Sequence, residues 1–285
     1  QDFLCFTYLC DMQWLKAIFK FYIDSSIHVS LAVCALMLTS AYVLPVQIST
    51  ELVAFVFLST VTGYNFVKYA GVARLHHMSL AKNLRIIQLF SLACFVGLLV
   101  VATYQRLEVI LVSAFLGVFT LLYAVPFLPH RKNLRSLQTI KIFIIAFVWA
   151  GTAVWLPLEK FSLVFSVEVM LRFLQLFVFV LALIIPFEIR DLSYDSMELK
   201  TLPQLIGVTK TKGLGYVFLM LFLILEIVLT AQIENLLSAA IIAVTLGVMI
   251  FFSSKKQSTY YASFWVELIP VIWLALLWGS QELFV

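Results

Sequence analysis

The sequence is poor in charge. Only 12% of its 285 residues are Asp, Glu, Lys or Arg, whereas 63% are hydrophobic. A soluble domain usually carries about a quarter charged and about half apolar residues, so this composition excludes an ordinary soluble protein. Three charge-free runs reach the ~20 residues that a helix needs to cross the hydrocarbon core; they are Ile86–Gln105, Val109–Pro129 and Asn235–Ser254. The sequence therefore predicts an all-α integral membrane protein.

Cysteine and linker sequences are also scarce. The four cysteines show no CxxC spacing, and two of them, Cys34 and Cys94, lie inside apolar runs. This pattern favours buried thiols over a disulfide framework or a cysteine metal site. Repeats, low-complexity tracts and Gly/Ser linkers are absent as well. We therefore expect one transmembrane domain over residues 1–285.

The apolar runs and the loops between them predict about nine spans, preceded by an interfacial amphipathic helix over residues 11–24. With the N-terminus in the cytoplasm, all but three of the 19 Lys and Arg residues fall on the cytoplasmic side; the exceptions are Arg106, Lys160 and Arg172. This is the bias that the positive-inside rule describes. The net charge of +4 is thus assigned to membrane orientation and not to nucleic acid. We expect a multi-pass protein, of a bacterial inner membrane, with its charged loops in the cytoplasm.

Charge is concentrated in the stretch Pro186–Lys212, PFEIRDLSYDSMELKTLPQLIGVTKTK, which follows an apolar segment. If that segment continues as a helix, Asp191 and Asp195 lie one above the other on a single face. Two carboxylates so placed repel each other unless a cation or water separates them. Carboxylate oxygens suit Mg²⁺, which is commonly held by one or two carboxylates and the phosphates of a substrate. A solvated loop face is the alternative interpretation.

This stretch resembles the second aspartate-rich motif of the UbiA superfamily, the intramembrane prenyltransferases. The residues that carry the resemblance are Arg190-Asp191, Asp195, Thr201-Leu202-Pro203 and Gly207. The resemblance extends from about Leu52 to the C-terminus. It implies a bundle of nine spans around a central cavity, Mg²⁺ at the catalytic residues Asp191 and Asp195, and Arg190 beside a diphosphate. The alternative for Arg190 is a structural pair with Glu188 or Asp191. The implied reaction transfers a prenyl group from a prenyl diphosphate to a lipophilic acceptor, such as an aromatic compound.

The first aspartate-rich motif of that family, NxxxDxxxD, is incomplete here. Asn65 matches its asparagine, but Tyr69 and Ala73 stand where the aspartates belong, and residues 52–107 contain no Asp or Glu. Asn65 and Lys68 are candidates for contact with the diphosphate, Lys68 as a point charge on phosphate. The alternative is that both are ordinary residues at the end of a helix.

A second basic loop, YAVPFLPHRKNLRSLQTIK, spans residues 123–141. It resembles the segment after the fourth span of the same family, which contributes to diphosphate binding there. The candidate diphosphate ligands are Tyr123, Arg131, Lys132 and Lys141, whose cations would supply the positive potential that a diphosphate needs. The alternative is that the basic residues only fix the orientation in the membrane.

Two acids, Glu226 and Glu267, fall inside predicted spans. A carboxylate at that depth marks a pathway, a polar cavity or an interhelical bond, or is protonated and structural. Three functions follow from the sequence. The first is a prenyltransferase; the second is a catalytically impaired protein of the same fold that binds an isoprenoid or another lipid. The third is a small-solute transporter that uses Glu226 and Glu267.

Overall fold

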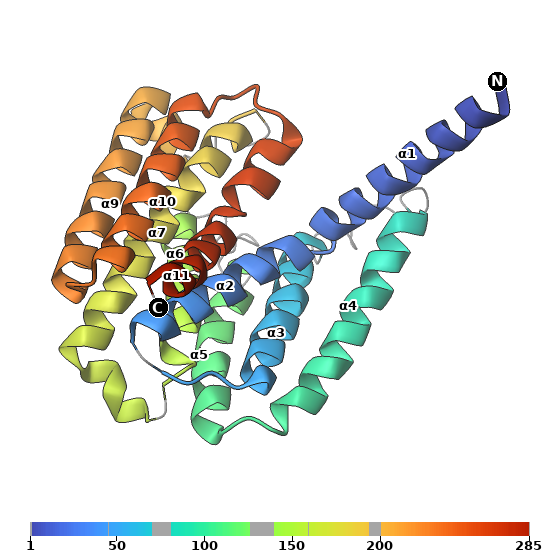
Figure 1. Ribbon diagram of the computed structural model, residues 1–285. Coiled ribbons are helices and arrows are strands. Elements are labelled where there is room, and N and C mark those ends of the chain that lie inside the picture. Colours follow the sequence, from blue (N-terminus) through green and yellow to red (C-terminus); the bar gives the residue numbers. More distant parts are fainter. Residues whose placement is uncertain are drawn as a thin grey trace.

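The computed structural model describes residues 2–44, 46–69, 81–125, 140–158, 160–193 and 201–284 (Figure 1). The side chains of residues 2–12, 81–83, 161 and 280–284 are outside this description. Within these ranges the chain forms helices and no strand. The prediction of an all-α protein is therefore confirmed.

The helices, in chain order, are α1 (Asp2–Asp24), α2 (Ile27–Val43), α3 (Thr50–Tyr69), α4 (Ala81–Ala102), α5 (Leu107–Ala124), α6 (Ile140–Trp155), the 3-10 helix η4 (Phe161–Phe165), α7 (Val167–Asp191), α8 (Leu202–Ile206), α9 (Val208–Leu229), α10 (Ile233–Phe252), the π-helix η6 (Tyr261–Val266) and α11 (Ile269–Phe284).

Seven of these segments are long and apolar enough to cross a membrane. The pair Gln13–Asp24 and Ile27–Val43, bent by 54°, counts as an eighth if it forms one broken span, and Ile140–Trp155 is a shorter apolar helix. The chain is thus a multi-pass membrane protein. The count of nine spans stays a prediction, because α6 has only 16 residues and rises about 24 Å, less than the ~30 Å hydrocarbon core.

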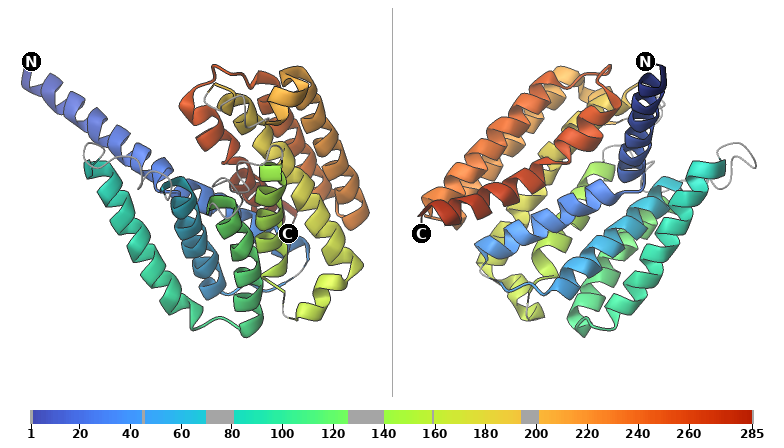
Figure 2. Two further views of the ribbon diagram at one scale, coloured as in Figure 1. Left: turned by 180° about the vertical axis from the view of Figure 1, so that it is seen from behind. Right: turned by 45° about the vertical axis from the view of Figure 1, so that its right-hand side comes forward.

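The helices pack against one another in a closed ring that includes α7 and α2. Along the ring α3 packs on α4 and α5, α5 on α6, α6 on α7, α7 on α9, α9 on α10, α10 on α11, and α11 on α2, which returns to α3 (Figures 1 and 2). Residues 178–186 of α7 are all buried. A helix that is apolar on every side can be surrounded by lipid or by other helices, and this part of α7 is surrounded by other helices.

Helix α1 leaves the bundle at an angle (Figure 2). Its side chains Trp14, Leu15 and Ile18 are strongly exposed, and Lys16 and Lys20 are exposed as well. Apolar and basic side chains on one exposed helix are typical of a helix at the membrane interface. An interfacial position for residues 11–24 is compatible with this exposure and stays a prediction.

A buried polar cluster ties four helices together at the end of the bundle away from Asp191. Arg172 Nη1 lies 3.6 Å from Glu226 Oε2, Gln175 hydrogen-bonds to both, and Arg172 Nη2 donates to Thr39 O at 3.1 Å. The Arg172 guanidinium also lies 5.3 Å from the centre of the Trp273 ring. The two charges of this cluster, Arg172 on α7 and Glu226 on α9, therefore lie beside each other. This contact is the interhelical bond that the sequence allowed for Glu226.

Candidate functional site at the end of helix α7

Asp191 is the last residue of α7. Arg190 Nε donates a hydrogen bond to Asp191 Oδ1 at 2.8 Å, and the two side chains are 24% and 33% exposed. The Arg190 guanidinium also lies 5.2 Å from the centre of the Phe187 ring. The predicted magnesium ligand therefore stands at an accessible end of the bundle with an arginine beside it.

Lys141 and Glu188 form an ion pair about one helical turn before Asp191. Lys141 Nζ, at the start of α6, lies 2.9 Å from Glu188 Oε1 on α7, and the two side chains are only 11% and 5% exposed. Glu188 precedes Asp191 by three residues, so both lie on neighbouring positions of one helix surface. The pair fixes α6 against the segment of α7 that carries Asp191.

Asn65 and Tyr69 hold the turn between α1 and α2. Ser26 Oγ donates to Asn65 Oδ1 at 2.8 Å, and Asn65 Nδ2 donates to Ser25 O at 2.9 Å and to Ser91 Oγ at 2.7 Å. Tyr69 Oη donates to Asp24 O at 2.9 Å. The last carbonyl groups of a helix have no hydrogen-bond donor within it. Here side chains of α3 donate to the carbonyls of Asp24 and Ser25. At positions 65 and 69 of the incomplete first motif, the side chains thus support a turn.

Lys68 lies on the same helix and remains exposed. Its Nζ makes one long contact, 3.4 Å to Ile23 O. No described carboxylate forms an ion pair with Lys68, so its charge is not neutralised by such a pair at the end of α3.

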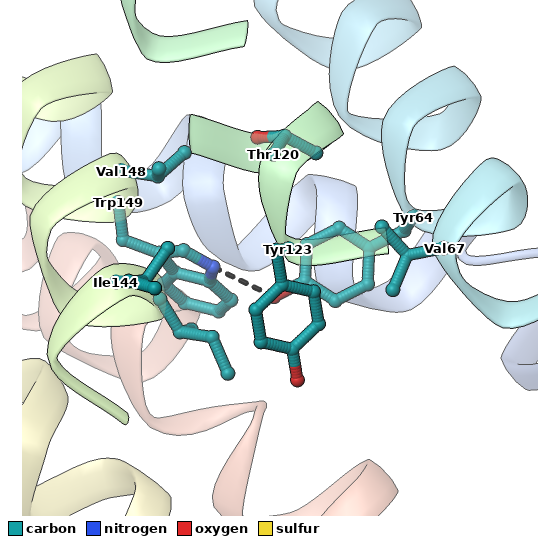
Figure 3. A pocket seen from close by; sticks show the side chains of 8 residues that line it. Tyr64, Val67, Thr120, Tyr123, Ile144, Val148 and Trp149 are labelled. Atoms are coloured by element: carbon teal, nitrogen blue, oxygen red, sulfur yellow. Dashed lines mark hydrogen bonds between the residues drawn. The ribbon is translucent and has the colours of Figure 1, made fainter. Parts of the chain in front are cut away.

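A cavity of about 110 Å³ lies between α3, α5 and α6, with an almost wholly apolar lining (Figure 3). Trp149 Nε1 donates to Tyr64 Oη at 2.7 Å across it. The predicted site residue Tyr123 also lines this cavity, and its hydroxyl points away from the Trp149–Tyr64 bond. The predicted diphosphate ligand Tyr123 therefore contributes its ring to an apolar cavity.

The Thr201-Leu202-Pro203 segment forms a short helix with defined ends. Gln204 Oε1 accepts from Thr201 N at 2.9 Å at the start of α8. Gly207 joins α8 to α9 with φ 81°, a conformation that glycine adopts without the steric cost of a Cβ. Thr211 Oγ1 then donates to Gly207 O at 2.9 Å. The segment reverses the chain after the aspartate-rich stretch.

Three predicted site residues, Asp195, Arg131 and Lys132, lie outside the described residues. Among the described residues, no group of three or more His, Cys, Asp or Glu side chains could hold a metal ion. Asp191 is the described carboxylate with the chemistry of a magnesium ligand, and phosphate oxygens of a substrate would have to complete the coordination.

Sequence reasoning missed Tyr64 and Trp149, and it assigned Glu267 only to the interior of a span. Tyr64 directly precedes Asn65, but a tyrosine in an apolar helix gives no sign of which neighbour it will meet. Glu267 is different, because its charge at that depth and Pro270 three residues later are visible in the sequence. Both features indicated an irregular helix with a polar group.

No protein-family model and no curated protein sequence matches the chain. Solved structures do. The structure of a UbiA homologue from Aeropyrum pernix K1, without ligand, superposes with a TM-score of 0.63 at 17% identity, over 90% of this chain and 98% of the other. A UbiA homologue from Archaeoglobus fulgidus bound to GPP and Mg²⁺ gives 0.59 at 13% identity, over 91% and 99%.

The chain has the UbiA fold. A digeranylgeranylglyceryl phosphate synthase superposes as well, with a TM-score of 0.56 at 17% identity over 94% of this chain and 99% of that one. The likeness to this fold therefore extends over nearly the whole chain. Within this fold, Arg190 and Asp191 end α7, whereas Asn65 and Tyr69 support the α1–α2 turn.

Proposed function

We propose that this protein is an intramembrane prenyltransferase that moves a prenyl group from a prenyl diphosphate to a lipophilic acceptor. The observation that carries the proposal is the Arg190–Asp191 pair, which lies at the end of α7 in a UbiA-fold bundle. The A. fulgidus homologue with this fold was solved with GPP and Mg²⁺, and also with DMAPP and Mg²⁺.

Each described side chain has a defined part in this proposal. Lys68 and Arg190 attract the diphosphate, Arg190 with a planar guanidinium that can bind two oxygens. Asp191, together with Asp195, would hold Mg²⁺, which neutralises charge on the departing diphosphate when it is bound. The rings of Tyr64, Tyr123 and Trp149 lie around the apolar cavity, and their faces can stabilise an allylic cation.

The experiment uses the full chain in detergent with radiolabelled geranyl diphosphate, Mg²⁺ and a mixture of lipophilic aromatic acceptors. We expect a prenylated product that disappears in Asp191→Ala and Asp195→Ala. Glu168→Gln is the matched control, because Glu168 is an exposed acid in the first turn of the same helix. Full activity in both aspartate variants would refute the proposed site.

The second candidate is a protein of this fold that binds an isoprenoid diphosphate without turnover. The observation that favours it is the bond from Tyr69 Oη to Asp24 O, because the position of a first-motif carboxylate serves the α1–α2 turn. Equilibrium binding of geranyl diphosphate with no acceptor-dependent product would support this candidate. The same assay therefore separates the two functions.

A further inference from the structure

The last part of α7, Pro186–Asp191, has a weak point in its own hydrogen bonding. Pro186 lies inside the helix and has no backbone N–H, so the carbonyl of Ala182 cannot receive its usual helical bond. The predicted magnesium ligand Asp191 follows this interruption and ends the helix. The orientation of the segment therefore depends in part on contacts from outside α7.

The turn between α10 and η6 makes such contacts on both sides of Asp191. Gln257 Nε2 donates to Pro186 O at 3.0 Å, and Ser193 Oγ donates to Lys255 O at 2.9 Å. Pro186 precedes Asp191 in the chain, and Ser193 follows it. Two separate hydrogen bonds therefore bracket Asp191 and join the end of α7 to residues 71 and 62 positions away in the sequence.

Gln257 also fixes the shape of this turn. Gln257 N donates to Ser254 O at 3.2 Å, and Gln257 Oε1 accepts from Ser254 N at 3.1 Å. An amide side chain carries both an acceptor and a donor. Here the oxygen is used within the turn and the nitrogen on α7. The turn is therefore closed by the same side chain that ties it to Pro186.

A second neighbour holds the same part of α7. The ion pair of Lys141 Nζ and Glu188 Oε1, 2.9 Å apart, joins it to α6. The segment that ends at Asp191 is thus fixed by an ion pair from one helix and by hydrogen bonds from the α10–η6 turn. Groups that orient a metal ligand in this way change metal affinity by about 10–100-fold when they are substituted.

We propose that Gln257 is a positioning residue for Asp191. From the α10–η6 turn it holds the end of α7 in the orientation in which the Asp191 carboxylate can bind Mg²⁺, and the Ser193–Lys255 hydrogen bond is the second tie. The inference rests on the proposed function and adds to it a residue outside the aspartate-rich stretch. Gln257 acts through the backbone of α7 and not by contact with the substrate.

A binding titration tests this role without turnover. Radiolabelled geranyl diphosphate is added to the full chain in detergent, without acceptor, and the Mg²⁺ concentration that gives half-maximal binding is measured. Gln257→Met removes both side-chain hydrogen bonds with little change in length. Ser193→Ala removes the other tie at an exposed position. We expect the half-maximal Mg²⁺ concentration to rise by about tenfold or more in Gln257→Met and by about threefold in Ser193→Ala.

Tyr261→Phe is the matched control. Tyr261 Oη donates to Met249 O at 2.7 Å, so this variant removes a hydrogen bond between η6 and α10 and leaves both ties to α7 in place. We expect its half-maximal Mg²⁺ concentration to stay within about twofold of wild type. An equal rise in Tyr261→Phe and Gln257→Met would assign the effect to a general loss of stability and overturn the inference. Unchanged values in both Gln257→Met and Ser193→Ala would overturn it as well.

Hydrogen exchange of the backbone amides of residues 187–193 tests the same role without Mg²⁺ or substrate. Loss of a tie should let this segment open more often, so exchange there should be about threefold faster or more in Gln257→Met and Ser193→Ala and unchanged in Tyr261→Phe. Unchanged exchange in the first two variants would overturn the inference. If wild type binds no geranyl diphosphate at any Mg²⁺ concentration, the proposed function is rejected, and the exchange rates alone decide whether Gln257 orders the end of α7.

Discussion

Asn65 Oδ1 accepts a hydrogen bond from Ser26 Oγ at 2.8 Å, so α3 is tied to the turn between α1 and α2. Asn65 is 3% exposed and makes two further hydrogen bonds through Nδ2. Ser26 has φ 65°, a left-handed conformation that a serine adopts at a cost. The amide of Asn65 therefore helps to hold a strained turn.

Asn65→Ala should destabilise the protein, because it leaves the buried polar groups of Ser25 and Ser26 and the half-buried Ser91 hydroxyl without their bonds. Each such loss costs about 1–3 kcal/mol. Thermal unfolding in detergent, followed by circular dichroism, would measure the loss. Tyr69→Phe removes a single bond to Asp24 O and should cost less, about 1 kcal/mol. Equal stability of wild type and Asn65→Ala would show that the turn does not depend on this amide.

The fold was largely predictable because long apolar runs separated by basic loops leave a membrane protein few alternatives. A helix before Asp191 was expected too, since the charge-free segment there predicted a membrane span. The role of Asn65 was not. An asparagine at a helix end can contact a ligand or a neighbouring turn, and the choice depends on residues 40 positions earlier.

The ion-pair partner of Lys141 was also not predictable from the sequence. Its position at the start of an apolar span suggested contact with a diphosphate, and the structure places its Nζ 2.9 Å from Glu188 Oε1. Sequence spacing does not reveal such pairs between separate helices. Glu267 is the opposite case. Its position deep in a predicted span indicated a polar role, but the sequence did not identify its neighbours in the fold.

The Lys141–Glu188 pair predicts a strong asymmetry between single and double variants. Lys141→Met leaves the buried Glu188 carboxylate without this cation, and removing one partner of a buried ion pair typically costs about 3–5 kcal/mol. Lys141→Met/Glu188→Met removes both charges and should recover most of the loss. Thermal unfolding of the three proteins in one detergent would test this. A double variant no more stable than Lys141→Met would contradict the pairing.

Gly207→Ala isolates the cost of a backbone conformation. Gly207 has φ 81°, and a Cβ placed there would meet no atom within 4 Å. Only backbone strain opposes the change, because φ 81° with ψ 158° is a conformation that is nearly restricted to glycine and costs another residue about 1–3 kcal/mol. Gly213→Ala is the matched control, because Gly213 also has open space around its Cβ position but lies inside helix α9. We expect a lower unfolding temperature for Gly207→Ala and an unchanged or higher one for Gly213→Ala.

For the buried pair of Arg172 and Glu226 we predict that a substitution changes the stability of the protein but not its affinity for a prenyl diphosphate. Asp191 lies 19 residues after Arg172 on α7, which is roughly 28 Å along a helix. Glu226→Gln removes the buried negative charge and leaves Arg172, which is 0% exposed, with neutral partners only. We expect the unfolding temperature to fall, because an unpaired buried charge is costly. We also expect the affinity for geranyl diphosphate to stay within about twofold, measured by equilibrium binding on the folded fraction. A large loss of that affinity at unchanged stability would instead connect Glu226 to the ligand, and would favour the transport function that the sequence left open.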